Sequence, residues 1–574
     1  MPTSSARHSP RRARLYDPSA YRDMFESSFT YESGLLRNRH RFAQRTALSS
    51  ADTGESWTYA QLGEQVDRIA GALFRLGIRG NDILQVELFN GPEFATLYQV
   101  SHRLRTVFSP TNFRLAPGEV THILDTGMPD VLVYDTARTD EIRQALALSS
   151  TPPHTLLAVG EGDPLPGAVP FRDLVEAAPI TPAELTENDA ALPRPSIYDE
   201  TSRMYTSGTT GWPKPVPLPS IVEVMSAHDV IMHFPLTPFD RTLNMTPLFH
   251  RGGLYSGGPN PVFYVGAEIM TLRHFDANRV LDLVEEHRLT YLIGAPTTLV
   301  ALAEAQEEHP RDLASLHGIV TMGAPLDRAA ALRFQQVLTP RIFNGYGTTE
   351  TFWNTFLRPE DLPDGSGSAG RSSTDDDVAV VHIYPDRLAG PTDTVAHDSS
   401  EIGEFAVRTP KAGYSYLNRD LEERKFVHGW FFPGDLAVWD QEEKVTILGR
   451  KDDMIISGGE NIHPVQVEAV LAEHPGVSDS IVIGVPDPQW GQLVAAYVVR
   501  DSEAGANALP EDPAAATAEL ERYMSTHPHL ARYKRPRLYR FVDSIPYNAT
   551  GKKVHAQASQ NAAADAAAGR FFTA

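Results

Sequence analysis

Residues 205–214 read Tyr205-Thr206-Ser207-Gly208-Thr209-Thr210-Gly211-Trp212-Pro213-Lys214. The two glycines allow the backbone to approach an anion closely, and the Ser and Thr hydroxyls can bond its oxygen atoms together with neighbouring amides. The lysine adds a positive charge. The stretch is not a Walker phosphate loop, because both the glycine-to-lysine spacing and the residue after the lysine are wrong. Taken alone, its residue types are about equally compatible with a phosphate-binding loop and with an ordinary turn.

Seven further segments follow this stretch, each rich in glycine, charged or aromatic residues: 247–250, 322–326, 344–350, 429–435, 449–453, 457–462 and 533–552. Their content and order resemble the signature of the adenylate-forming superfamily. That superfamily comprises acyl- and aryl-CoA synthetases, nonribosomal peptide adenylation domains and firefly-type luciferases. The resemblance covers residues 45 to 555 approximately. It is closest to the aryl- and fatty-acyl-CoA ligases.

The resemblance implies an α/β fold in two parts. A large N-terminal α/β domain of several subdomains, one of them β-barrel-like, is followed by a small mobile C-terminal α+β domain. We expect a basic tail and lead-in at 1–40, the large AMP-binding domain at 41–451 and the mobile domain at 452–574, with Asp452 as the hinge.

Local patterns agree with alternating helices and strands. Thr58 and Gln61 form a capping box before a helical pattern, and 277–286 reads as a second helix. Strands are expected at 131–134, 290–293 and 318–321, and loops with short strands at 358–400. In the C-terminal part Pro464 begins a helix, and strands follow at 480–483 and 495–499. The Ala-rich tail after Gly551 is expected to fray.

The resemblance also implies that the chain binds ATP and Mg²⁺. The nucleotide-binding residues that it implies are Thr206, Ser207, Gly208, Thr209, Thr210, Gly211, Lys214, Gly323, Ala324, Asn344, Gly345, Tyr346, Gly347, Thr348, Asp435, Arg450 and Lys552. An ionised Asp435 has two acceptor oxygens that suit the two ribose hydroxyls. Arg450 offers a fork of donors to the ribose and phosphates, and Tyr346 can stack on adenine.

Three residues are expected to act in the chemistry. Lys552 would neutralise charge as a carboxylate attacks the α-phosphate, because that step joins two anions. Glu350, with Thr209, would hold Mg²⁺ beside the substrate phosphates. His250 occupies the family position that borders the acyl and pantetheine sites. Read without the resemblance, each would be an ordinary exposed or packed side chain.

The acyl pocket is expected to involve Phe249, His250, Gly253, Gly323 and Gly347, and the acceptor side Gly458 and Gly459. The mixture of aromatic, His and Arg residues at 249–255 favours an aromatic or polar acid over a long alkyl chain. Coenzyme A is the expected acceptor. A carrier-protein thiol or an amine is an alternative, as is a diazotase-like activation of nitrite for an arylamine. A non-catalytic nucleotide-binding scaffold is disfavoured because Lys214, Glu350, Asp435 and Lys552 are all present.

Several positions depart from the family pattern. Pro215 and Pro433 replace a glycine and a threonine, and Arg103-Leu104-Arg105-Thr106 replaces small residues. Near the terminal lysine, Tyr547 replaces an arginine and His555 replaces a basic residue. The departures leave every expected catalytic residue in place.

Composition sets further limits. The chain has 574 residues and a net charge of −22, which disfavours general nucleic-acid binding, since phosphate backbones would be repelled. It has no cysteine, so the thiol of any thioester must come from the acceptor. No apolar run is long enough for a membrane span, and a cytoplasmic monomer or homodimer is expected. The Arg-rich segment 6–14 is expected to be a solvated tail.

Overall fold

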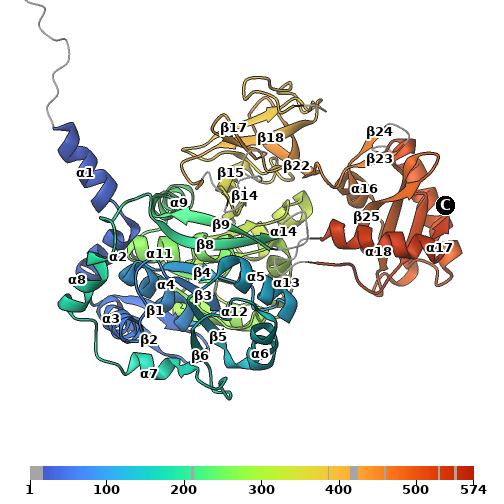
Figure 1. The fold of residues 1–574 in the computed structure, drawn as a ribbon. Helices are drawn as coiled ribbons and strands as arrows, with labels where there is room; N and C mark the ends of the chain where they lie inside the picture. The colour runs from blue at the N-terminus through green and yellow to red at the C-terminus, as the bar shows by residue number, and fades with distance from the viewer. Residues whose placement is uncertain are drawn as a thin grey trace, which may run out of the picture.

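The computed structural model describes residues 17–207, 213–384, 387–413, 416, 425–457, 460–527, 530–547 and 553–573. Figure 1 shows a large part, coloured blue to yellow, with a smaller orange-to-red part at its side. The expected α/β fold with a large N-terminal and a small C-terminal domain is thereby confirmed. No helix among the described residues is long and apolar enough to cross a membrane.

A seven-stranded sheet forms one half of the large part, in the order β7-β6-β5-β3-β4-β8-β9. Its pairings are parallel except that of β9 with β8. The strands are β3 (Ile83–Glu87), β4 (Val107–Pro110), β5 (Val131–Asp135), β6 (Thr155–Val159), β7 (Val169–Pro170), β8 (Glu200–Ser207) and β9 (Pro213–Pro219).

A nine-stranded sheet forms the other half, in the order β16-β15-β14-β13-β12-β10-β11-β1-β2. Its inner pairings are parallel, and β2, β15 and β16 add antiparallel edges. The strands are β1 (Thr46–Ser50), β2 (Ser56–Thr58), β10 (Arg241–Asn244), β11 (Glu268–Thr271), β12 (Tyr291–Gly294), β13 (Gly318–Met322), β14 (Ile342–Thr348), β15 (Phe352–Leu357) and β16 (Arg371–Ser372).

Helices cover and separate these sheets. The capping box expected at Thr58 is confirmed: Gln61 N donates to Thr58 Oγ1, and Thr58 N donates to Gln61 Oε1. The helices are α1 (Pro18–Ser28), α2 (Tyr31–Arg41), α3 (Tyr59–Arg75), α4 (Pro92–Leu104), α5 (Pro117–Gly127), α6 (Thr139–Leu148), α7 (Phe171–Val175), α8 (Pro182–Ala190), α9 (Ser220–His233), α10 (Arg251–Tyr255), α11 (Pro259–Val265), α12 (Ala277–His287), α13 (Pro296–Glu308) and α14 (Arg328–Val337). Buried residues begin in α2, at Tyr31, whereas α1 has none.

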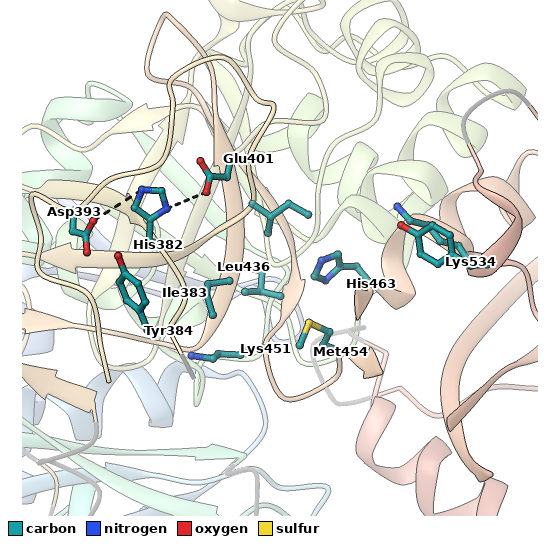
Figure 2. A pocket seen from close by; sticks show the side chains of 12 residues that line it. His382, Ile383, Tyr384, Asp393, Glu401, Leu436, Lys451, Met454, His463 and Lys534 are labelled. Atoms are coloured by element: carbon teal, nitrogen blue, oxygen red, sulfur yellow. Dashed lines mark ion pairs between the residues drawn. The ribbon is translucent and has the colours of Figure 1, made fainter. Parts of the chain in front are cut away.

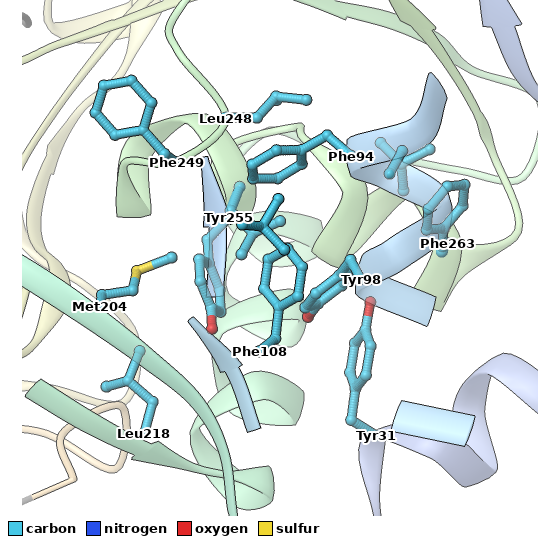
Figure 3. Close-up of a cluster of buried hydrophobic side chains, with 14 of the residues drawn as sticks. Tyr31, Phe94, Tyr98, Phe108, Met204, Leu218, Leu248, Phe249, Tyr255 and Phe263 are labelled. Carbon is cyan, nitrogen blue, oxygen red and sulfur yellow. The ribbon is translucent and has the colours of Figure 1, made fainter. Parts of the chain in front are cut away.

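One hydrophobic cluster joins the two sheets. Figure 3 shows Tyr31 of α2, Phe94 and Tyr98 of α4 and Phe108 of β4 packed beside Tyr255 of α10. The same cluster includes Ile293 of β12 and Phe343 of β14. The helices between the two sheets therefore pack against both sheets. Burial of this much apolar surface is the main force that fixes the sheets relative to each other.

A third sheet follows, and every described pairing in it is antiparallel. Its first strand lies within 358–400, where loops with short strands were expected. Its strands are β17 (Asp377–Val381), β18 (Gly403–Arg408), β19 (Phe426–Val427), β20 (Trp430–Phe431), β21 (Asp435–Trp439) and β22 (Val445–Arg450).

The C-terminal part has its own six-stranded sheet, and the helix and strands expected there are confirmed. Its strands are β23 (Ile455–Ser457), β24 (Glu460–Ile462), β25 (Val477–Asp487), β26 (Gly491–Arg500), β27 (Leu538–Phe541) and β28 (Phe572–Thr573). Its helices are α16 (Pro464–Ala472), α17 (Pro513–Thr526) and α18 (His555–Ala567). Two separate clusters of apolar residues form its core.

The expectation of a fraying tail is wrong. Residues 555–567 form α18, in which Ala558 and Ala562 are fully buried against Ile481 and Ile483 of β25. Because the two alanines are four residues apart, they lie on one face of the helix and allow it to pack close to the sheet. The chain then adds β28 to the sheet beside β27.

Candidate functional site

The stretch 205–214 includes the end of β8 and the start of β9. In the antiparallel register Thr206 lies opposite Lys214, and Ser207 lies opposite Pro213. The first hydroxyl residues and the lysine therefore lie at the same end of this strand pair. The expected phosphate-binding residues Gly208, Thr209, Thr210 and Gly211 lie outside the described residues.

The segment 344–348 forms the end of β14. Thr321 of β13 lies opposite Asn344, and Gly323 follows β13 with φ of 91°. Asn344 is buried, and its side-chain oxygen has no hydrogen-bond partner among the described residues. Strand alternation places Asn344 on the same face as Tyr346. An unpartnered acceptor there fits the amino group of a bound base.

Two of the expected nucleotide-binding glycines are explained by packing against β15. A Cβ on Gly347 would lie 1.5 Å from the Phe352 carbonyl oxygen, and one on Gly345 would lie 2.8 Å from Trp353 Nε1. The close approach of β15 therefore requires glycine at 347 independently of any ligand. Ala324, by contrast, is exposed at the end of β13.

Tyr346, Asp435 and Arg450 form one polar group. The Tyr346 hydroxyl donates to Asp435 Oδ2, and Arg450 Nη1 donates to Asp435 Oδ1 at 3.0 Å. Asp435 and Arg450 are direct partners in the β21–β22 ladder, which explains why the salt bridge is short. Burial and the Asp435 carboxylate together raise the pKa of Tyr346 well above its ordinary value, so the hydroxyl remains a donor. Each carboxylate oxygen keeps a second lone pair for a ribose hydroxyl.

Glu350 lies in the turn after β14. The Tyr416 hydroxyl donates to Glu350 Oε1 at 2.7 Å, and burial followed by the Glu350 charge raises the pKa of Tyr416. Within the described parts of the chain no three His, Cys, Asp or Glu side chains cluster as metal ligands. A single carboxylate nevertheless fits Mg²⁺, which commonly binds one protein carboxylate, substrate phosphates and water. Thr209, the other expected ligand, lies outside the described residues.

The expected acyl-pocket residues Phe249 and His250 immediately precede α10. Their rings lie 4.2 Å apart between centroids, and Phe113 packs edge-on against Phe249 at 5.4 Å. His250 N donates to the Pro247 carbonyl at 3.1 Å. A Cβ on Gly253 would lie 2.0 Å from that carbonyl oxygen, so the tight turn requires a glycine.

Arg251 is a central residue whose role the sequence did not indicate. It is almost fully buried, and its Nη1 donates to the Thr349 carbonyl at 2.6 Å while its Nη2 donates to the Lys411 carbonyl at 2.9 Å. Burial lowers the pKa of Arg251 to about 10. The guanidinium therefore ties the acyl-pocket segment directly to the residue before Glu350. In the sequence Arg251 was visible only as one charged residue among the aromatic and small residues of 249–255.

Lys425 is a second residue that the sequence did not indicate. Its Nζ donates to the Pro433 carbonyl at 2.9 Å, and a Cβ on Gly434 would lie 3.1 Å from Nζ and 3.6 Å from Arg450 Nη2. Burial, followed by repulsion from Arg450, lowers the pKa of Lys425. Two cations thus lie beside a glycine immediately before Asp435, an arrangement suited to a phosphate or ribose oxygen.

A cavity of about 530 Å³ lies between the third sheet and the C-terminal part (Figure 2). Leu436, Lys451, His463 and Lys534 are among the residues that line it. None of the expected nucleotide-binding residues that the structure describes lines the cavity. Because Leu436 alternates with Asp435 along β21, Leu436 faces the opposite side of that strand from Asp435. The cavity is therefore a space between the two parts of the chain, on the other side of β21 from the expected nucleotide-binding residue Asp435.

The expected hinge lies at the edge of this space. Asp452 is exposed, and its Oδ2 lies 3.7 Å from Arg450 Nη2. Asp453 N donates to the Arg450 carbonyl at 3.2 Å, which closes a turn over 450–453. Gly458 and Gly459, expected on the acceptor side, and Lys552, expected to act in catalysis, lie outside the described residues.

Comparison with known proteins agrees with this arrangement. The AMP-binding enzyme family matches residues 35–417, and the AMP-binding enzyme C-terminal domain matches residues 466–552. The long-chain-fatty-acid–CoA ligase FadD13 of Mycobacterium tuberculosis is 32% identical over 90% of this chain and 96% of its own length. The indoleacetate–CoA ligase of Aromatoleum aromaticum is 32% identical over 86% of this chain and 91% of its own.

A solved anthranilate CoA ligase in complex with anthranoyl-AMP has a TM-score of 0.78 and 25% identity, and the match covers 94% of this chain and 98% of that one. Because the family matches run along most of the chain, this protein belongs to the AMP-binding enzyme family and is an enzyme of the AMP-forming acyl- and aryl-CoA ligase group.

Proposed function

We propose that the protein is an ATP-dependent ligase that adenylates a small aromatic carboxylic acid and transfers the acyl group to coenzyme A. The observation that carries the proposal is the bond from Arg251 to the Thr349 carbonyl. It joins the acyl-pocket segment ending at His250 to the turn that holds Glu350, so an acid and a metal-bound phosphate would meet in one place.

ATP would lie across three elements. The segment 206–214 would bind its phosphates, Asp435 and Arg450 its ribose, and the end of β14 its adenine. Glu350 and Thr209 would hold Mg²⁺, which supplies charge neutralisation at the phosphates when bound.

In the first half-reaction the substrate carboxylate oxygen forms a bond to the α-phosphorus, and the bond to the pyrophosphate oxygen breaks. The role proposed for Lys552 is to offset the growing negative charge at the α-phosphate. In the second half-reaction the thiol sulfur of coenzyme A bonds to the acyl carbon and loses its proton, and AMP leaves. Gly458 and Gly459 are proposed to lie on the acceptor side of this step.

Two domains would divide these tasks. The large domain, 41–451, carries the nucleotide and acyl sites, and the small domain, 452–574, carries Lys552. A pivot at Asp452 allows the small domain to bring Lys552 in for adenylation and to remove it for transfer.

An aromatic acid is the substrate class that fits best. The Phe113, Phe249 and His250 rings pack against one another beside the proposed pocket, and aromatic faces favour an aromatic ligand. Among the relatives, a feruloyl-CoA synthase of Amycolatopsis is 32% identical. It and the indoleacetate and anthranilate ligases are named for aromatic acids.

The test is a pyrophosphate-release screen of the full chain with aromatic acids, alkyl acids of matched length and nitrite. Each is measured alone, with coenzyme A, with a phosphopantetheinylated carrier protein and with an arylamine. We expect release with aromatic acids and acyl-CoA formation with coenzyme A. Pyrophosphate release with nitrite plus arylamine would instead support the diazotase-like activity. Acyl product formed only with the carrier protein would instead support a carrier-protein thiol as the acceptor.

Lys552→Ala is the matched control for the chemistry. We expect it to lower adenylate formation by two or more orders of magnitude, about 3 kcal/mol in transition-state stabilisation, with unchanged thermal stability. Pyrophosphate exchange at the wild-type rate would remove Lys552 from the mechanism.

A further inference from the structure

The described residues on either side of the segment that carries Lys552 are held to the sheet of the C-terminal domain. Tyr547 and Lys553, the described residues on either side of 548–552, form an antiparallel β-bridge. Both contact the same carboxylate of β25: the Tyr547 hydroxyl donates to Asp479 Oδ2, and Lys553 Nζ lies 3.0 Å from Asp479 Oδ1. Lys553 Nζ also donates to the Ser480 carbonyl at 2.6 Å. The base of this segment is therefore fixed to β25.

His555 connects this base to the proposed hinge. Its Nε2 lies 2.7 Å from Glu468 Oε1, and its Nδ1 lies 3.9 Å from Asp453 Oδ2. Glu468 Oε1 also accepts a hydrogen bond from Val482 N at 2.8 Å, so the carboxylate is itself held in place. Asp453 directly follows the proposed pivot, and His555 is the first residue of α18. One imidazole thus lies between the start of the mobile domain and the end of the Lys552 segment.

The charges around His555 favour its protonated form. Burial and the nearby Lys553 ammonium lower its pKa, whereas Glu468 of α16 and Asp453 at the hinge raise it. The carboxylates prevail, and the pKa of His555 lies above its ordinary value of 6.5. The imidazolium shares a hydrogen bond with Glu468 and attracts Asp453 through its charge across the 3.9 Å separation. Deprotonation therefore keeps the contact with Glu468 and removes the attraction to Asp453.

We propose that His555 is a positioning residue for adenylation: as an imidazolium it links Asp453 to Glu468, so that rotation at Asp452 is transmitted to the segment that bears Lys552. The inference rests on the adenylation role proposed for Lys552. It concerns only the first half-reaction, because acyl transfer requires Lys552 to be elsewhere.

The test measures the two half-reactions separately as a function of pH, with adenylation followed by pyrophosphate release and transfer started from chemically made adenylate. In the wild type we expect the adenylation rate to fall as the pH rises through the pKa of His555, measured by NMR in the full chain. His555→Gln should lower the adenylation rate about tenfold at low pH, because a hydrogen bond to a charged group is lost. It should also abolish the fall in the adenylation rate as the pH rises. Transfer should be unchanged. His555→Arg, which stays charged, should restore adenylation at high pH.

The matched control is His527→Gln, since His527 Nε2 lies 2.9 Å from Glu473 in the same domain, away from the hinge. It should leave both half-reactions at wild-type rates. If His555→Gln does not fold, Asp453→Asn replaces it. Removal of one carboxylate should lower the pKa of His555, so the adenylation rate should begin to fall at a lower pH. The inference would be overturned if the adenylation rate fell at the same pH in Asp453→Asn as in the wild type, or if both half-reactions slowed equally.

Failure of the inference can be told apart from failure of the proposed function. An inactive Lys552→Ala combined with a wild-type rate and pH profile in His555→Gln removes only the positioning role. An active Lys552→Ala removes the premise itself.

Discussion

Asp435 is held by the fold at the position proposed to bind the ribose of ATP. Its two oxygens already accept from Tyr346 and Arg450, which come from different sheets of the large domain. The carboxylate is therefore held in one orientation, which would reduce the ordering cost of the proposed ATP binding. The role of Asp435 in ATP binding stays a prediction from the sequence, whereas its orientation depends on a contact between residues 89 positions apart.

Asp435→Ala should weaken ATP binding by roughly 1.5–3 kcal/mol, because ribose hydroxyls lose a charged acceptor. Tyr346→Phe is the comparison: it keeps the carboxylate and removes only the group that orients it, so we expect a smaller loss. Calorimetric titration with ATP measures both. Equal affinities for wild type and Asp435→Ala would show that Asp435 is only a structural partner of Arg450.

Glu87 is a buried carboxyl at the end of β3. Neither of its oxygens has a hydrogen-bond partner among the described residues, and the nearest cation is Arg138 Nη2 at 3.8 Å. Burial raises the pKa of Glu87 to about 8, although Arg138 opposes the shift. The folded protein thus keeps a proton up to about pH 8 that the unfolded chain releases above its ordinary pKa of 4.5. Stability should therefore fall as the pH rises through this window.

Glu87→Gln should remove this pH dependence and raise the free energy of unfolding at pH 8 by roughly 1–3 kcal/mol, because the amide is neutral throughout. The exposed Glu161→Gln is the control and should leave the profile unchanged. Urea unfolding at several pH values measures the effect. A wild-type slope between pH 5 and about 8 in Glu87→Gln would mean that another group carries the proton.

At the scale of elements, the sequence predicted what is local and missed what is tertiary. The capped helix α3, the amphipathic α12 and the apolar strands β12 and β13 have strong periodic signals, and they were found. The helix α18 was missed because an alanine-rich stretch has little contrast between its apolar and polar faces. The bond from Arg251 to Thr349 joins residues 98 positions apart, a distance at which no local pattern carries information.

The packing of α18 can be tested by a matched pair of substitutions. Ala562 is fully buried against β25, whereas Ala563 is exposed on the same helix. Ala562→Leu should destabilise the C-terminal domain by roughly 1–3 kcal/mol, because a well-packed contact cannot accept the added volume. Ala563→Leu adds the same atoms to solvent and should have little effect. Faster hydrogen exchange in β25 and α18 for Ala562→Leu alone is the expected result, and equal exchange in the two variants would contradict it.

At the scale of the whole molecule, the cavity between the third sheet and the C-terminal domain bears on the two-step mechanism. It is lined by Lys451 from one side of the proposed pivot and by His463 and Lys534 from the other (Figure 2). Lys451 is held to the large part by a bond from its Nζ to Glu404 Oε2 at 2.8 Å. Rotation after Lys451 would therefore change the shape of this space and leave the proposed nucleotide site on the other face of β21 intact.

Asp452→Pro tests whether the pivot lies there. Asp452 is the third residue of the turn closed by the bond from Asp453 N to the Arg450 carbonyl. Proline fixes φ near −65° and constrains the preceding residue, and it is disfavoured at this position of a common turn. The variant should hold the small domain in a restricted range of orientations, so one half-reaction should slow by at least about tenfold while the other survives.

Asp452→Ala keeps the backbone freedom and loses only the weak contact to Arg450, so both of its half-reactions should stay near the wild-type rates. Single-turnover pyrophosphate release and transfer from chemically made adenylate measure the two steps. If Asp452→Pro left both unchanged, the two orientations would have to be reached through another residue, because a fixed φ at the pivot is incompatible with a large rotation about it.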